Sequence, residues 1–101
     1  MTKNTRPFDE LLAEMLDSPE AIAGYLDEAL ATGTEADFLL AVKNVAKLTG
    51  MTHLAEQTGL SRESMYKTLS ETGNPKLDTL SLILHHLGLR LSVTPDESRA
   101  A

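Results

Sequence analysis

Hydrophobic residues recur every three or four positions along most of this chain, which is the spacing of the buried face of an α-helix. The first stripe consists of Phe8, Leu11, Leu12 and Met15. Similar stripes place helices over residues 8–16, 19–31, 35–49, 53–58, 62–70 and 77–87. Their expected inward residues include Leu26 and Leu30 in the second helix and Leu77 and Ile83 in the last. The pattern therefore predicts an all-α protein of six short helices.

Residues that favour helix ends separate these stripes. Serine and threonine side chains accept hydrogen bonds from the free N–H groups of a first helical turn. This predicts N-caps at Ser18, Thr34, Thr52 and Ser61. The start of the last helix stays open between a cap at Asn74 and one at Asp78.

The C-terminal residues have a different hydrophobic pattern, which repeats every second position. Leu89, Leu91 and Val93 alternate with polar residues, which is the pattern of a short strand. Such a strand either closes its own core or pairs with a second copy of the chain, so these three residues are the predicted dimer contacts. The polar tail, residues 95–101, is expected to be disordered.

Composition limits the kinds of protein this can be. The chain has 101 residues, 42% of them hydrophobic, and neither cysteine nor tryptophan. That length predicts one compact core, and the missing cysteines exclude disulfides, thiol catalysis and Cys-ligated metals. No apolar run approaches the roughly 20 residues of a membrane span. We therefore expect a cytosolic protein that is not inserted in a membrane.

Charge divides the chain into two parts. The formal net charge is −6, yet residues 41–90 hold six basic and four acidic residues. Residues 1–40 hold nine acidic residues against two basic ones. The asymmetry indicates two surfaces with different partners, although an acidic half that serves solubility alone remains the plainer alternative.

Residues 52–69 are typical of a helix-turn-helix. Ala55 lets two helices cross closely, Gly59 permits a left-handed turn, and Met65 and Leu69 face the first helix. The second helix then presents hydroxyl, guanidinium and ammonium groups outward, which suits a helix in the major groove of DNA. A generic helical hairpin is the alternative.

Each outward residue has an expected role on DNA. Arg62 is placed for a guanine edge and Glu63 for cytosine, whereas Tyr66 and Lys67 lie nearer the backbone. The predicted DNA-binding residues are Thr52, Ser61, Arg62, Glu63, Ser64, Tyr66, Lys67, Asn74 and Lys76.

The segment LAEQTGLSRESMYKTLSETGNPKLDTLSLILHHLGLRLSV resembles the body of addiction-module antidote proteins, a HigA-like branch of the Cro/phage-repressor helix-turn-helix group. The resemblance covers about residues 6–94 and departs at Met65, where leucine is expected. It implies an all-α DNA-binding antitoxin that represses its own operon. We expect a five-helix repressor-like domain with an extra N-terminal helix, and a dimer, because one recognition helix reads only a few base pairs. The resemblance also implies a partner, a RelE/ParE-like toxin that cleaves mRNA on the ribosome.

A toxin that acts on mRNA is expected to be basic, so the acidic residues 1–33 form the predicted toxin-binding segment. Residues 34–94 form the predicted DNA-binding domain. The expected toxin contacts are Phe8 and Leu12, as exposed apolar anchors, with the acids Asp9, Glu10, Glu14, Asp27 and Glu28.

Other functions find little support in the residues. The serines lack a nucleophile elbow and a histidine placed to activate them, so no catalytic residues and no enzyme activity are expected. No set of ligands has metal-binding spacing, and no cofactor is expected. Two alternatives remain: a stand-alone phage- or plasmid-derived regulator without a toxin, and an interaction module that has lost DNA binding. The protein would work in the bacterial cytosol, at the nucleoid.

Overall fold

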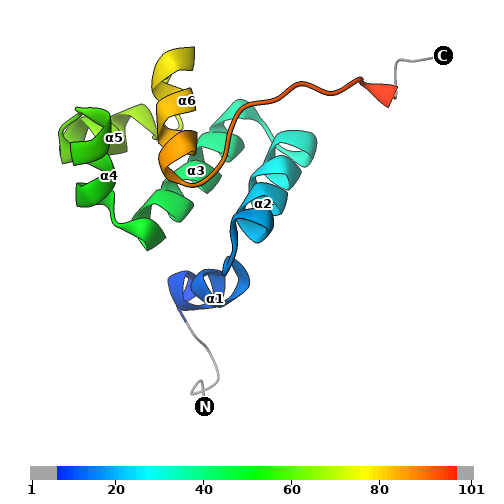
Figure 1. Ribbon diagram of the computed structural model, residues 1–101, viewed down its shortest axis with the longest axis horizontal. Helices are drawn as coiled ribbons and strands as arrows, with labels where there is room; N and C mark the ends of the chain where they lie inside the picture. The colour runs from blue at the N-terminus through cyan, green and yellow to red at the C-terminus, as the bar shows by residue number, and fades with distance from the viewer. Residues whose placement is uncertain (1–6, 98–101) are drawn as a thin grey trace.

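The computed structural model describes residues 7–97, without the side chain of Asp9, and their regular structure is entirely helical (Figure 1). The predicted all-α class is therefore confirmed. The helices are α1 (Phe8–Met15), α2 (Pro19–Thr32), α3 (Glu35–Thr49), α4 (Met51–Thr58), α5 (Arg62–Thr68) and α6 (Leu77–His86).

Three of the four predicted N-caps are confirmed. The Ser18 hydroxyl oxygen accepts from the backbone N–H of Ala21 at 3.1 Å. Thr34 and Asp37 form a reciprocal capping box, in which the carboxylate accepts from the Thr34 N–H at 2.8 Å. The Ser61 hydroxyl oxygen accepts from the N–H of Ser64 at 3.0 Å. These bonds fix where α2, α3 and α5 begin.

The predicted caps at Thr52, Asn74 and Asp78 are wrong. α4 begins earlier, because the Gly50 carbonyl already accepts the N–H of Leu54 at 3.0 Å, and Thr52 lies inside the first turn. α6 begins after Lys76, whose carbonyl accepts the N–H of Leu80 at 2.9 Å. Neither helix has a side-chain cap, so the local cap preference did not decide their starts.

The core surrounds α3, which contacts α1, α2 and α4, while α4 also contacts α5 and α6. Its most buried side chains come from several helices, because Val42 and Val45 on α3 join Met65 on α5, Leu69 just after it and Ile83 on α6. The α4–α5 pair and α1 consequently lie at separate corners of the molecule (Figure 1).

Several residues of the predicted stripes are exposed. Leu30 is 58% exposed and Leu77 is 71% exposed, and neither side chain belongs to the core cluster. α1 differs most from its predicted stripe, since Phe8 and Met15 face solvent while Leu12 is buried. The expectation that Leu12 is an exposed anchor is therefore wrong.

No strand forms within residues 89–96, so the predicted C-terminal strand is not found. A strand needs a neighbouring strand for its backbone hydrogen bonds, and residues 7–97 offer none. The chain instead leaves α6, passes along α2 and then extends beyond the helices (Figure 1). Leu89 packs against the core, but Val93 is 96% exposed. Residues 98–101 of the predicted tail lie outside the described part of the chain.

Candidate DNA-binding helix and acidic groove

α4 and α5 are joined by a tight turn at Gly59-Leu60-Ser61. Gly59 has a left-handed backbone (φ 78°, ψ 9°), and the N–H of Leu60 returns to the Ala55 carbonyl at 3.1 Å. A β-carbon built on Gly59 would meet nothing within 4 Å, so its backbone conformation and not lack of space favours glycine. The turn sets the direction in which α5 leaves.

The inner side of α5 is anchored in the core. Met65 and Leu69 are fully buried, and Leu54 and Ala55 of α4 are buried with them. The predicted inward residues of both helices are therefore confirmed. The other side of α5 is open to solvent, where Ser61, Arg62, Glu63, Ser64 and Lys67 are all exposed.

Arg62 lies against an aromatic ring. Its guanidinium carbon is 5.3 Å from the ring centroid of Tyr66, which itself packs partly buried against the core. This is cation–π distance, and the half-buried ring provides a fixed platform for the guanidinium. Sequence reasoning missed the pair, although the two residues are four apart on one helix, where side chains meet.

The two serines at the start of α5 are linked. The Ser61 hydroxyl donates to the Ser64 hydroxyl at 2.9 Å while its oxygen accepts from the Ser64 N–H. The other predicted DNA-binding residues lie outside α5. Thr52 is exposed on α4, and Asn74 and Lys76 are exposed in the loop before α6.

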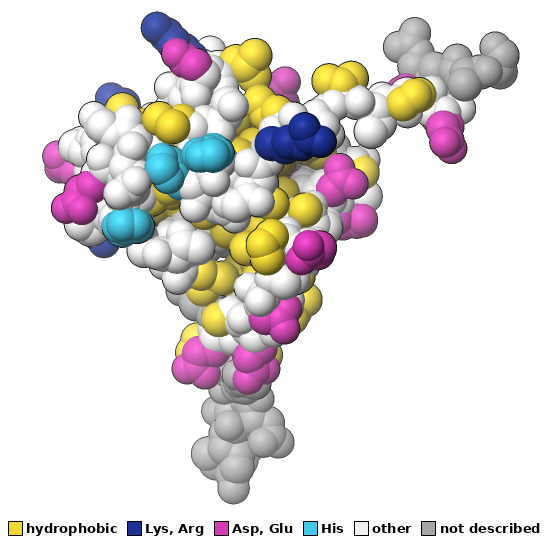
Figure 2. All heavy atoms as spheres, viewed as in Figure 1, with side chains coloured by type: hydrophobic (Ala, Val, Ile, Leu, Met, Phe, Trp, Pro, Cys, Tyr) yellow, Lys and Arg dark blue, Asp and Glu magenta, His cyan; other side chains and the backbone are white. Residues whose placement is uncertain are grey.

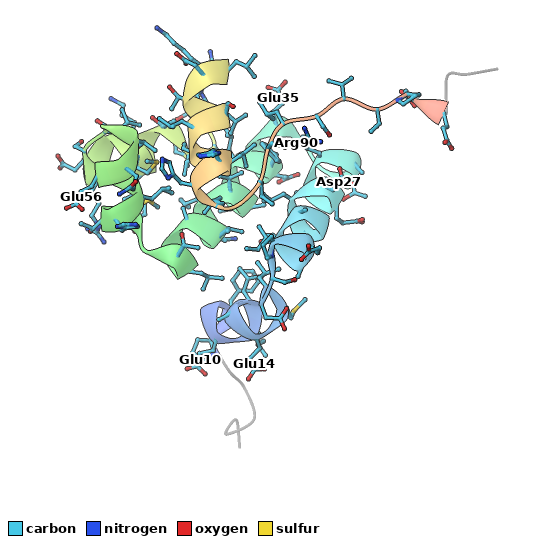
Figure 3. All side chains as sticks on the ribbon, viewed as in Figure 1. Glu10, Glu14, Asp27, Glu35, Glu56 and Arg90 are labelled. Carbon is cyan, nitrogen blue, oxygen red and sulfur yellow. The ribbon has the colours of Figure 1, made fainter. Side chains whose placement is uncertain are left out.

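The predicted toxin contacts are divided between different places. Glu10 and Glu14 are exposed on α1, at the end of the molecule away from α4 and α5 (Figure 3). Glu28 lines a groove of about 500 Å³ among α1, α2 and α3. Its neighbour Asp27 lines a second groove, of about 650 Å³, between α2 and the C-terminal segment. The acidic residues thus do not form a single contact surface.

The first groove is hereafter called the α1–α3 groove. Its exposed apolar residues are Phe8, Met15 and Leu40, and Glu28 lies at the same groove. Sequence reasoning missed Leu40, which lies beside the buried stripe of its helix.

A hydrogen-bonded polar pair also lines this groove. The Asn44 amide donates to the Tyr25 hydroxyl at 3.3 Å. Asp37, which caps α3, lies in the lining as well. The α1–α3 groove therefore combines an apolar wall with a few polar groups and two acidic residues.

Within residues 7–97, no three histidine or acidic side chains are grouped so that they could hold a metal ion. None of the helices in the same range is long and apolar enough to cross a membrane.

Sequence relatives identify the family. The model of a family described as "Probable addiction module antidote protein" matches residues 4–95. An uncharacterized protein of Haemophilus influenzae (strain Rd) is 38% identical over 93 residues, which cover 92% of this chain and 94% of that protein. No solved structure matches. The chain therefore belongs to the family of probable addiction module antidote proteins.

Proposed function

We propose that this antidote protein is a helix-turn-helix repressor of the HigA-like, Cro/phage-repressor type, which binds operator DNA through α5 and neutralises a RelE/ParE-like toxin. Family membership supports a toxin partner in general. The arrangement of α5 is the observation that supports the proposed DNA binding. Its inner side is fixed by Met65 and Leu69, and its outer side presents two cations and two hydroxyl groups.

The dimensions and charges of α5 suit the major groove. A helix with its side chains is about 10–12 Å across, and the groove is about 12 Å wide. Arg62 is at the first helical position and Lys67 lies in the last turn, so the two cations are more than one turn apart. An N-terminal arginine reaches base edges in this geometry, whereas a later lysine lies nearer phosphate.

Alanine substitution at each cation tests this role. Arg62→Ala should weaken operator binding by about 1–3 kcal/mol and relax sequence preference at one operator position. Lys67→Ala should weaken binding to operator and scrambled duplexes alike and lower the salt slope by about one. The measurement is a set of binding isotherms on both duplexes at several salt concentrations.

Arg90→Ala is the matched control, because it removes one exposed cation on the C-terminal segment, far from α5 (Figure 3). It should bind both duplexes like the unchanged chain. If the variants at Arg62 and Lys67 also bind the operator like the unchanged chain, α5 does not read DNA and this assignment is overturned.

A further inference from the structure

We infer that the α1–α3 groove is the docking site for the toxin, and that it takes an amphipathic segment with apolar side chains on one side and lysine or arginine beside them. The inference rests on the proposed antitoxin function. The proposed toxin site is thereby narrowed from the acidic residues 1–33 to the α1–α3 groove.

Apolar side chains are unusually exposed at this groove. Phe8 is 57% exposed, Met15 66% and Leu40 47%, and all three line the groove from α1 and α3. Scattered exposed apolar residues are ordinary, but residues that converge on one concave surface mark an interaction site. α1 buries only Leu12 among its large apolar residues, so its apolar stripe is left for a partner.

The charge at the groove is negative. Glu28 and Asp37 belong to its lining, to which residues 7–97 contribute no lysine or arginine. Glu10 and Glu14 on α1 add negative charge at the same end of the molecule. Among the described residues, Figure 2 shows acidic and hydrophobic side chains, and no Lys or Arg, over this end on the face in view. Complementary charge therefore selects a basic partner.

Two other kinds of macromolecule fit this groove poorly. A second copy of this chain would bring the same acidic residues to the interface, because a two-fold pairing places the same patch on both sides. Like charges placed opposite one another disfavour that pairing. Nucleic acid is disfavoured for the same reason. A basic protein segment remains, and an amphipathic helix lying in a hydrophobic groove is a recurrent way for proteins to bind such segments.

The hydrogen-bonded polar pair within the groove can fix the orientation of a bound segment. The Asn44 amide donates to the Tyr25 hydroxyl, so each group keeps further hydrogen-bonding capacity. A few polar groups on an apolar wall fix the orientation of a bound segment.

The experiment measures binding of the full chain to the purified toxin encoded in its operon, by titration calorimetry and by rescue of growth. Leu40→Glu should weaken toxin binding at least about tenfold and lose the rescue, because it puts a charge on the apolar wall. Leu30→Glu is the matched control, since Leu30 is a similarly exposed leucine on the other groove. It should change toxin affinity less than about twofold. Both variants should keep the helical content and operator binding of the unchanged chain.

A second pair of variants tests the charge. Glu28→Lys should slow association with the toxin, and the difference should shrink as salt is raised. The control is Asp27→Lys, which makes the same change one residue earlier, at the second groove. Equal effects of Glu28→Lys and Asp27→Lys would show that general charge, and not this groove, attracts the toxin.

The outcomes separate the two proposals. If the unchanged chain neutralises the toxin and Leu40→Glu does so equally well, the groove is not the docking site, and the antitoxin function stands. The docking site is also overturned if Leu40→Glu alters the sedimented mass of the chain but not its affinity for toxin, because the groove would then bind a second copy. If the unchanged chain neither binds nor neutralises the toxin, the proposed function fails, and the docking site with it.

Discussion

At the scale of single residues, α5 holds its polar groups in place through contacts of its own. Arg62 lies over the ring of Tyr66, and the Ser61 hydroxyl is bonded to Ser64. A side chain that is already held loses less conformational entropy when it binds a partner. If α5 binds DNA as proposed, Arg62 contributes more to operator binding than its charge alone would, and Tyr66 acts as its positioning residue.

Replacing the ring of Tyr66 tests this role. Tyr66→Leu should lower operator affinity about two- to fivefold, because a cation–π contact contributes about 0.5–1 kcal/mol at an exposed site. Binding to a scrambled duplex should change less, since the loss acts through a base contact. Tyr66→Phe keeps the ring and is the control, so it should bind the operator like the unchanged chain. If Tyr66→Phe is as weak as Tyr66→Leu, the hydroxyl and not the ring is what matters.

At the scale of elements, the sequence predicted well where helices form, and it predicted poorly which of their apolar side chains are buried. The caps at Ser18 and Ser61 are correct because each depends on an atom three residues away. Leu30 and Leu77 satisfied the same helical spacing as the buried Leu26, yet both are exposed. Whether an apolar residue is buried depends on which neighbour covers it, and periodicity does not carry that information.

Two glycines provide a matched test of backbone conformation. Both accept a β-carbon without contact within 4 Å, but Gly59 is left-handed whereas Gly24 lies inside α2. Gly59→Ala should lower the free energy of unfolding by about 1–2 kcal/mol, the cost of a left-handed alanine. Gly24→Ala should raise it by about 0.5–1 kcal/mol, because alanine favours a helix interior. Urea unfolding of the two variants measures both changes, and a Gly59→Ala variant as stable as the unchanged chain would contradict the turn assignment.

At the scale of the whole molecule, the acidic half of the sequence is divided between α1 and two grooves, and α5 lies apart from α1. α5 lies at one corner and the acidic α1 at another, so the proposed sites for DNA and for the toxin do not overlap (Figure 1). Charge counting along the chain predicted two surfaces, but it placed Asp27 and Glu28 together. Adjacent residues on a helix point about 100° apart. The two acids therefore line different grooves, which a count of charges does not reveal.

The C-terminal segment is the proposed contact between two copies of the chain. One recognition helix reads only a few base pairs, so repressors of this kind act as dimers on half-sites about one helical turn apart. Leu91 is 40% exposed and Val93 is 96% exposed on a segment without a strand partner among residues 7–97. Two such segments can pair through their open backbone groups, with these side chains as the shared apolar face.

We therefore predict that the chain sediments as a dimer at micromolar concentration, and that Val93→Asp converts it to a monomer. The monomer should bind the operator more weakly, since each copy would then contact one half-site alone. Val93 is too exposed for the substitution to disturb the helices, and their melting should stay unchanged. Thr94→Asp adds the same charge at the next exposed position and should remain dimeric, because alternate residues of a paired segment face opposite sides. A chain that sediments as a monomer both free and on operator DNA would contradict the pairing, and α5 would then have to bind DNA as a single unit.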